Sequence, residues 1–266
     1  MSQSEYMFRS PAFYFKHKLS REPRDAYFPH SHNLFEILYF LNGDATHVIE
    51  DKKYKLKRGD LVLIRPSSYH FIQINSPAEY ERYDILFDET ALGIRISDFI
   101  SDDTDVINIQ ANPIARSIFE KLDYYLENFS QEDFSVLLQL LLKELFYDLR
   151  VTEKQTVPVF SVVSPILSRA LRYINEHLFT LDSVASVAEA VFVTEGYLHK
   201  LFREELKNSP KKYITDKRLL AAQRLLAIGE KPTKVYENCG FRDYSTFYRS
   251  YVNFFGYSPS QEQHVR

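Results

Sequence analysis

Three histidines and one glutamate have the types and spacing of groups that bind one small ligand together. His30 and His32 are separated by a single residue, Glu36 follows closely, and His70 lies further along the chain. Imidazoles and a carboxylate suit divalent Zn, Fe or Mn. They also form internal hydrogen bonds, or line a polar pocket for a small effector. We expect the pocket, with no bound metal and no cofactor.

Further polar side chains near predicted strands are candidates for the same pocket. Tyr14, Tyr39, Arg65 and Arg82 each lie on or beside such a strand. Because neighbouring strand residues point to opposite faces, an error of one residue turns a side chain away from the pocket. The predicted effector-binding set is His30, His32, Glu36, Tyr39, Arg65 and His70.

Two segments in the last part of the chain have the pattern of a helix-turn-helix. Residues 181–202 and 234–255 each contain a small or apolar cluster, a short turn and a helix with apolar positions at three- and four-residue spacing. Either segment alone is also consistent with a helix whose polar face is solvated. Two together indicate a reader of duplex DNA, since base edges are read by such polar faces. The side chains expected at DNA are Thr194, His199, Lys200, Arg203, Lys211, Lys212, Arg242, Ser245, Thr246 and Arg249.

One helix is predicted between these two segments. Residues 210–229 have apolar residues at core spacing and end at Gly229. Roughly twenty residues at ~1.5 Å rise span ~30 Å. Successive major-groove faces of B-DNA lie ~34 Å apart. The connector is therefore long enough to place two recognition helices in consecutive grooves.

Charge is divided unequally along the chain. The net charge of −3 combines 15 Lys and Arg against 11 Asp and Glu from Pro165 onward with 18 against 25 before it. Positive charge thus accumulates where the DNA-reading segments lie. The single cysteine, Cys239, rules out an internal disulfide and fits a reducing cytoplasm. Since no apolar run reaches the ~18 residues of a membrane span, we expect a cytoplasmic protein without a membrane partner.

The first half of the chain has the rhythm of an antiparallel β-sandwich or barrel. Turn residues such as 42–44 and 58–60 separate short runs rich in β-branched and aromatic residues. The predicted strands are 13–15, 35–41, 45–49, 61–64, 69–74 and 83–87.

Two amphipathic helices are predicted after these strands. They cover residues 113–129 and 134–149, and the second has a wide leucine stripe. Leucine in excess of one face favours self-association, although a purely intramolecular core is the alternative. We expect Leu138, Leu141, Leu142 and Leu145 to form a dimer contact. Residues 151–164 lack helical periodicity and contain Pro158, so they are predicted to be an interdomain linker.

The C-terminal motifs resemble those of the AraC/XylS transcriptional regulators. The resemblance covers residues 166–261 and implies a double helix-turn-helix DNA-binding domain. The family often has Gly where Lys207 stands, and Asn208 beside it can take the left-handed conformation that ends such a helix. The matching residues are Thr194, Tyr197, Leu198, Phe202, Arg203, Tyr213, Arg218, Ala222, Leu226, Gly240, Phe241, Asp243, Ser245, Phe247, Phe255, Gly256, Ser258 and Pro259.

The His and Glu residues of the first half resemble the two motifs of the cupin barrel. The first is His30-x-His32-x3-Glu36-x6-Gly43, and the second is Gly59-x6-Pro66-x3-His70. In enzymatic cupins the corresponding three His and one Glu bind a divalent metal. Barrels similar to the arabinose regulator are generally metal-free sensory pockets. The resemblance therefore supports a sensing role for this barrel.

These observations predict an α+β protein of four parts. A cupin-like antiparallel β-barrel covers residues 1–112, a helical dimerisation segment 113–150, a linker 151–164, and an all-α domain with two helix-turn-helix motifs 165–266. We expect a DNA-binding transcriptional regulator, an activator rather than an enzyme, that senses a sugar or related metabolite. Its partners would be operator DNA, the effector, a second copy of the chain and RNA polymerase. The alternatives are a metal-dependent cupin enzyme with a DNA-binding appendage, and a ligand-free regulator whose barrel only dimerises.

Overall fold

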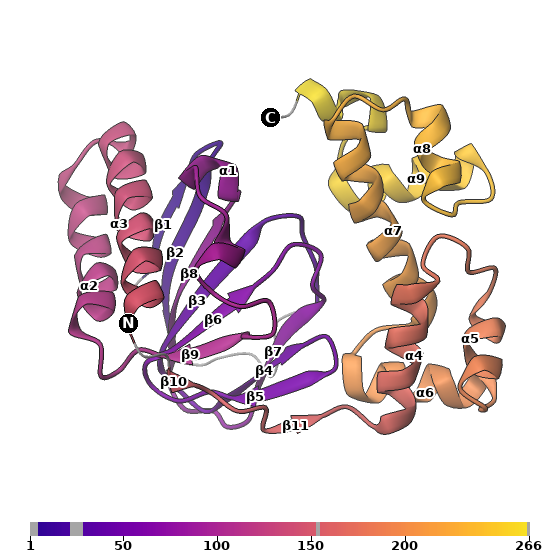
Figure 1. Ribbon diagram of the computed structural model, residues 1–266, viewed down its shortest axis with the longest axis horizontal. Coiled ribbons are helices and arrows are strands. Elements are labelled where there is room, and N and C mark those ends of the chain that lie inside the picture. The colour runs from indigo at the N-terminus through magenta and orange to yellow at the C-terminus, as the bar shows by residue number, and fades with distance from the viewer. Residues whose placement is uncertain (1–4, 22–28, 153–154, 265–266) are drawn as a thin grey trace. The chain divides into compact units, whose positions relative to one another are not determined.

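The computed structural model describes residues 5–21, 29–152 and 155–264. Two compact units are present: among the described residues, 5–21 and 34–161 form the first, and 29–33 and 162–264 form the second. The first unit contains the strands and the helices α1–α3, and the second is helical (Figure 1). Among the described residues, no helix is both long and apolar enough to cross a membrane.

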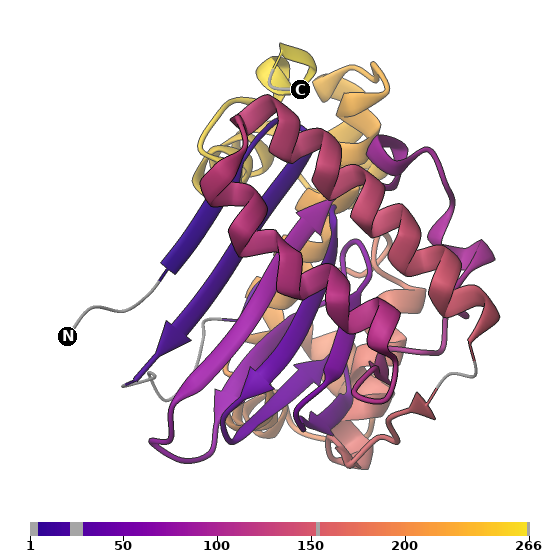
Figure 2. The ribbon, with the colours of Figure 1, turned by 90° about the vertical axis from the view of Figure 1, so that its left-hand side faces the viewer.

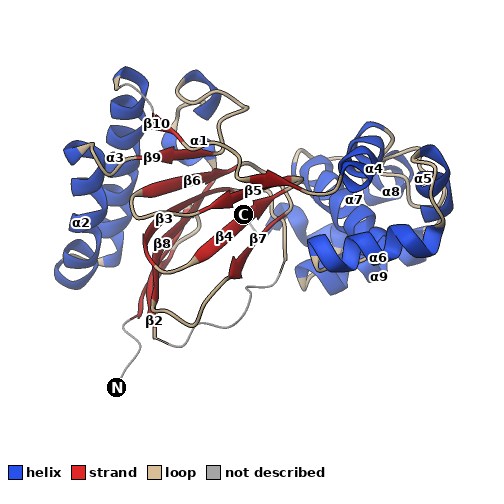
Figure 3. Ribbon diagram, turned by 90° about the horizontal axis from the view of Figure 1, so that it is seen from below, coloured by secondary structure: helices blue, strands red, loops and turns tan. Residues whose placement is uncertain are grey.

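The strands of the described residues form two antiparallel sheets (Figure 3). One sheet has the order β1-β2-β8-β3-β6-β9-β10, and the other has the order β11-β5-β4-β7. All six predicted strands are present, and the short strands β1, β5, β9, β10 and β11 are additional. The strands are β1 (Glu5–Arg9), β2 (Phe13–Ser20), β3 (Phe35–Asn42), β4 (Ala45–Ile49), β5 (Lys52–Lys55), β6 (Asp60–Ile64), β7 (His70–Ile74), β8 (Tyr80–Phe87), β9 (Val106–Asn108), β10 (Gln155–Thr156) and β11 (Ser161–Val162).

The alternation of side chains along β3 divides the first unit into two cores. Leu38 and Phe40 pack in an interior cluster with Ile72 of the second sheet. Ile37 and Tyr39 belong instead to a larger cluster that includes the helices packed on the other face of the first sheet. Because successive strand residues point to opposite faces, Glu36 shares the interior face with Leu38.

Two long helices cover the outer face of the first sheet (Figure 2). These are α2 (Pro113–Asn128) and α3 (Gln131–Val151), capped by the Asn112 and Ser130 side chains. The leucines expected at a dimer contact, Leu138, Leu141, Leu142 and Leu145, are only 0–7% exposed and pack in the core of this chain. They cannot offer a surface to a second copy, so the intramolecular alternative holds for these four side chains.

His17 on β2 helps to hold α2 against the sheet. Its Nδ1 lies 2.6 Å from Asp123 Oδ2 on α2, and its Nε2 lies 3.0 Å from Glu81 Oε1 on β8. Its ring stacks on Tyr83 with the ring centroids 4.0 Å apart. Burial alone would lower the pKa of His17, but the two carboxylates outweigh burial and raise it. By bridging Asp123 and Glu81, His17 helps to fix the position of the helix.

The predicted linker pairs with the edges of both sheets. α3 extends to Val151, and residues 153 and 154 lie outside the described part of the chain. β10 pairs with β9, and β11 lies beside β5. Backbone N–H groups of Val157 and Phe160 donate to carbonyls of Val106 and Lys53, each at 2.9 Å. The segment is thus bound along the strands over most of its length.

The second unit consists of six helices and a terminal 3-10 turn within the described residues. As predicted, a single helix, α7, lies between two helix pairs, α5–α6 and α8–α9. The remaining helices of the first unit are α1 (Glu89–Leu92) and η1 (Ile96–Asp98). The helices of the second unit are α4 (Pro165–Glu176), α5 (Val184–Ala190), α6 (Glu195–Leu206), α7 (Pro210–Ala227), α8 (Pro232–Asn238), α9 (Tyr244–Phe255) and η2 (Pro259–His264).

Two residues of the first helix pair adopt left-handed backbone conformations although they are not glycine. Lys207 ends α6 with φ 57°, so this residue, and not Asn208, forms the left-handed cap. Phe192 in the turn between α5 and α6 has φ 61°, and its side chain is 92% exposed. A bulky residue in this region is strained, so the turn is held by the packing of the helices around it.

Candidate nucleic-acid interface and ligand site

The first helix-turn-helix presents a basic face on α6. Thr194 caps the helix by accepting a hydrogen bond from the Tyr197 N–H at 3.3 Å. Leu198 and Phe202 are fully buried. Lys200 and Arg203 are exposed on the opposite side, as predicted from the helical spacing. The helix thus has a free polar face of the kind that enters a major groove.

The second helix-turn-helix presents a similar face on α9. The Asp243 carboxylate accepts a hydrogen bond from the Thr246 N–H at 2.8 Å and caps the helix. Phe247 and Tyr251 are buried, whereas Ser245, Thr246 and Arg249 are exposed. The Arg249 Nε–H donates to the Ser245 carbonyl at 3.3 Å, which leaves the rest of the guanidinium directed outward.

Several predicted DNA-binding side chains already make contacts within the chain. His199 lies 3.6 Å from Glu195, and Lys200 lies 3.9 Å from Glu204, both as exposed pairs one turn apart. Such exposed pairs are weak and can exchange for phosphate. Lys211 and Lys212 are exposed at the start of α7, where Lys212 pairs with Asp216. Arg242 precedes α9 and donates to the Asp182 carbonyl at 2.9 Å.

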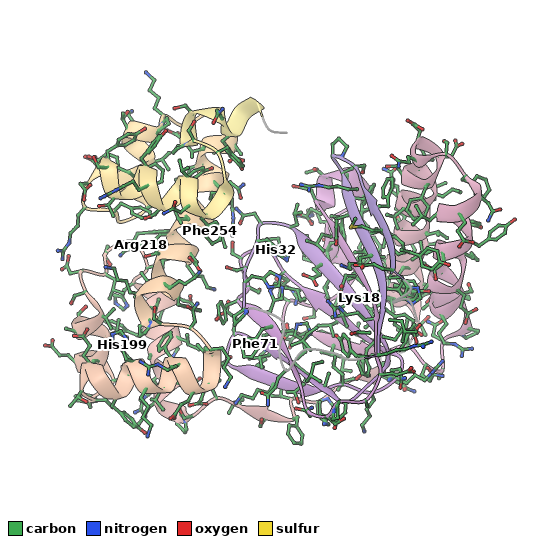
Figure 4. All side chains as sticks on the ribbon, turned by 180° about the vertical axis from the view of Figure 1, so that it is seen from behind. Lys18, His32, Phe71, His199, Arg218 and Phe254 are labelled. Carbon is green, nitrogen blue, oxygen red and sulfur yellow. The ribbon has the colours of Figure 1, made fainter. Side chains whose placement is uncertain are left out.

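The Arg218 guanidinium joins both motifs to α7. It donates to the carbonyls of Leu178, Leu181 and Gly240 at 2.8, 2.6 and 2.7 Å. Leu178 and Leu181 precede α5 of the first motif, and Gly240 lies in the turn of the second. Arg218 lies midway along α7, between the two motifs (Figure 4). A planar, permanently charged group with five donors is suited to hold several carbonyls at once.

Gly240 is required at this junction by space and by backbone conformation. Its φ is +77°, and a Cβ there would lie 2.5 Å from the Phe179 carbonyl oxygen and 3.0 Å from the Arg218 Cζ. Next to it, Cys239 is completely buried, and burial raises the pKa of its thiol to about 11. The thiol is therefore a packing group in the core of the helical unit.

Of the six predicted effector-binding residues, the structure brings Glu36 and His70 together within the first unit. His30 and His32 lie in the segment 29–33, which belongs to the second unit, and their ring centroids are 5.7 Å apart. Glu36 Oε2 lies 3.2 Å from His70 Nε2, and both residues are almost fully buried. The other ring nitrogen of His70, Nδ1, donates to the Ser68 carbonyl at 2.9 Å. That hydrogen bond fixes the ring orientation, as it does for many metal-bound histidines.

Additional charged groups face the same interior. Arg82 Nε lies 2.7 Å from both carboxylate oxygens of Asp84, and both side chains are nearly buried. Burial raises the pKa of Asp84, and the charge of Glu36 raises it further. The sequence analysis missed Asp84. Its signal was present in β8, where Arg82 and Asp84 alternate with apolar residues and must share one face.

A cavity of about 380 Å³ lies beside the turn between β1 and β2 in the first unit. Tyr14 and Leu86 line it, together with Arg9 at the end of β1. Leu86 is the register partner of Glu36 on β3 and of Tyr14 on β2, so these three side chains project from one side of the sheet. Tyr14 is therefore placed as a pocket side chain.

The predictions for Tyr39 and Arg65 are not supported by their surroundings. Tyr39 faces the helices and stacks on Phe119 of α2, with ring centroids 4.3 Å apart. It lies one position from the interior-facing residues of β3. Arg65 binds Asp105 Oδ1 at 3.1 Å and the Ser101 and Thr104 carbonyls, so it fixes a loop. The residues that line the cavity of about 380 Å³ include none of the six predicted effector-binding residues.

The fold and these sites define a class: a DNA-binding protein with two helix-turn-helix motifs and a separate strand-rich domain with a polar interior. Residues 14–146 match the AraC-like ligand binding domain family, and residues 187–264 match a helix-turn-helix domain family. The chain belongs to the AraC/XylS family of transcriptional regulators.

Relatives of known role are similar over most of the chain. The lactose operon transcription activator of Staphylococcus xylosus is 26% identical over 236 residues, covering 84% of this chain and 78% of that protein. The activator RhaR of Cronobacter sakazakii is 23% identical over 257 residues, covering 90% and 87%. Among solved structures, ToxT of Vibrio cholerae is 14% identical with a TM-score of 0.39, covering 96% of this chain and 98% of ToxT.

The close approach at Gly240 gives a stability prediction with an internal control. Gly256 also has positive φ, at +83°, but a Cβ there meets nothing within 4 Å. Gly256→Ala should lower the free energy of unfolding of the helical unit by roughly 1–2 kcal/mol, because of its backbone conformation alone. Gly240→Ala should lower the free energy of unfolding by a further amount of roughly 1–3 kcal/mol, because its Cβ would also overlap neighbouring atoms. Urea unfolding followed by circular dichroism measures both, and equal losses would contradict the role of the Arg218 junction.

Proposed function

We propose that this protein is a cytoplasmic transcription activator, not an enzyme, that senses a small polar metabolite. The observation that carries the proposal is the presence of two recognition helices, α6 and α9, with exposed basic faces and a common attachment to α7. The 18 residues of α7 span ~27 Å at ~1.5 Å per residue. This is close to the ~34 Å between consecutive major-groove faces.

The relatives support a sugar or a related compound as the effector. Two of them are named for the lactose and raffinose operons. A cavity of about 380 Å³ falls within the size of small-molecule sites. Charged groups on the same face, including Glu36 and Asp84, could accept hydrogen bonds from hydroxyl groups. RNA polymerase is the partner that we propose for activation.

The proposed function is tested by the residues expected to touch base edges. Arg249→Ala and Arg203→Ala should each weaken operator binding by roughly 1–3 kcal/mol and relax preference at one base pair. Fluorescence anisotropy with an operator selected from a random pool measures both effects. Lys143→Ala, on α3, removes one cation from the other unit and serves as the control. An Arg249→Ala protein that binds the operator as tightly as the parent would show that α9 does not read bases.

The residue types of His30, His32, Glu36 and His70 favour a second candidate, a metal-dependent cupin enzyme. Three imidazoles and one carboxylate are donors that suit Zn, Fe or Mn. A metal there would supply Lewis-acid chemistry. We favour direct contact with the effector, because Glu36 and His70 already pair with each other and the relatives are regulators.

Metal removal distinguishes these two candidates. We expect purified full-length protein to hold far less than one equivalent of Zn, Fe or Mn, and DNA binding to survive EDTA. Lactose, raffinose and simple sugars are screened by thermal shift, and Glu36→Gln should abolish the response to an active compound. One tightly held equivalent of metal, with turnover of a small substrate, would favour the enzyme.

We further propose that the protein dimerises through the outward face of α3. Val136, Leu140 and Tyr147 are 54–56% exposed and lie opposite the buried leucines. Apolar residues at this spacing form one stripe of a helix. Two linked DNA-binding units gain affinity from effective concentration.

The dimer surface is tested with two leucines on opposite sides of α3. Leu140→Lys should give a folded monomer with weaker operator binding, because it charges an exposed apolar stripe. Leu142→Lys should instead unfold the strand-rich unit, because Leu142 is fully buried. Analytical ultracentrifugation and circular dichroism separate these results. A parent protein that is monomeric at micromolar concentration would exclude this interface.

A further inference from the structure

A groove of about 490 Å³ lies between the two helix-turn-helix motifs. One wall is α7, and the others are the start of α5 and the first half of α9. All three elements belong to the second unit. Ile214 and Thr215 of α7, Ser183 and Val184 at the start of α5, and Thr246 and Ser250 of α9 line it.

Cations are distributed along this groove. Lys211 stands at the start of α7, Arg218 follows two turns later, and Arg242 lies opposite them before α9. Arg218 uses its donors on three carbonyls, but its positive charge remains. Two carboxylates, Asp182 and Asp243, also line the groove, and Asp243 is engaged in capping α9.

Hydroxyl groups occupy much of the remaining polar lining. Ser183, Thr215, Thr246 and Ser250 come from three different helical segments. Hydroxyl side chains together with Lys and Arg are the groups that commonly contact phosphate and sugar in protein–DNA complexes. The polar side chains of the groove are therefore those of a backbone-binding surface, and they lie beside apolar lining residues such as Leu181, Ile214 and Phe241.

The groove is continuous with the face of α9 that is expected to read bases. Thr246 belongs both to the groove lining and to the exposed N-terminal half of α9. Ser250, one turn further along, also faces the groove. A duplex seated on α9 would thus bring its backbone to the edge of this groove.

We propose that the groove binds the sugar–phosphate strand that separates the two major-groove segments read by α6 and α9. This inference rests on the proposed function and adds a third, sequence-independent contact between the two reading helices. Its role is to fix the spacing of the two segments on the duplex. Lys211 would bind phosphate, and Thr215 lies in the wall beside that contact.

Opposite charges introduced at Thr215 test this placement. For a random-sequence duplex, the slope of the logarithm of the association constant against log[NaCl] is negative. Thr215→Lys should make it steeper by about 0.9, since one more counterion is released. This corresponds to binding about eightfold tighter at 0.1 M salt. Thr215→Glu should weaken binding by at least a similar factor. A purely structural effect would weaken binding in both variants.

Two further variants complete the experiment. Lys211→Ala should reduce the salt slope by about 0.9, whereas Lys143→Ala on α3 should leave it unchanged. Thermal unfolding of each variant checks that the helical unit remains folded. If Thr215→Lys and Thr215→Glu both bind DNA with the parental slope, the groove does not face the duplex. If the parent protein itself binds no duplex, the proposed function fails instead.

Discussion

One partly buried guanidinium determines how the DNA-reading unit is assembled. Arg218 reaches carbonyl groups that belong to the entry of one motif and to the turn of the other. A lysine offers a single point of attachment and could not satisfy three carbonyls in one plane. The glycine at position 240 follows from this arrangement, since any side chain would occupy the space of the junction. Recognition helices, groove and connector are thus parts of one rigid arrangement.

In the strand-rich unit, the register of β3 determines which side chains face the interior and which face the helices. Glu36 and Tyr39 are three residues apart, so they fall on opposite faces of one sheet. The first pairs with His70 in the interior, and the second stacks beneath α2. Sequence motifs could identify the His and Glu residues because their spacing carries the signal. The facing of isolated polar residues such as Tyr39 and Arg65 depends on register, which no motif supplied.

Helical periodicity predicted the helices correctly, but it did not predict which side of each helix is buried. Both faces of α3 are apolar, and the richer leucine face is the one buried in the chain. Only the packing of α3 on the sheet determines which stripe stays exposed. Likewise, a left-handed cap was predicted at the end of α6, but Lys207 takes that conformation instead of the better suited Asn208. The buried face of α3 and the cap of α6 are both determined by contacts with residues that are close in space but distant in sequence.

The pairing of the connecting segment with both sheets limits how the two units can be separated or exchanged. β10 and β11 cover backbone groups of β9 and β5 that would otherwise form open sheet edges. Open edges recruit other strands and promote aggregation. A sensor domain cut at the end of α3 would expose both edges, whereas one that retains residues through Val162 would keep them covered. A fusion of this sensor to a different DNA reader should therefore be joined after β11.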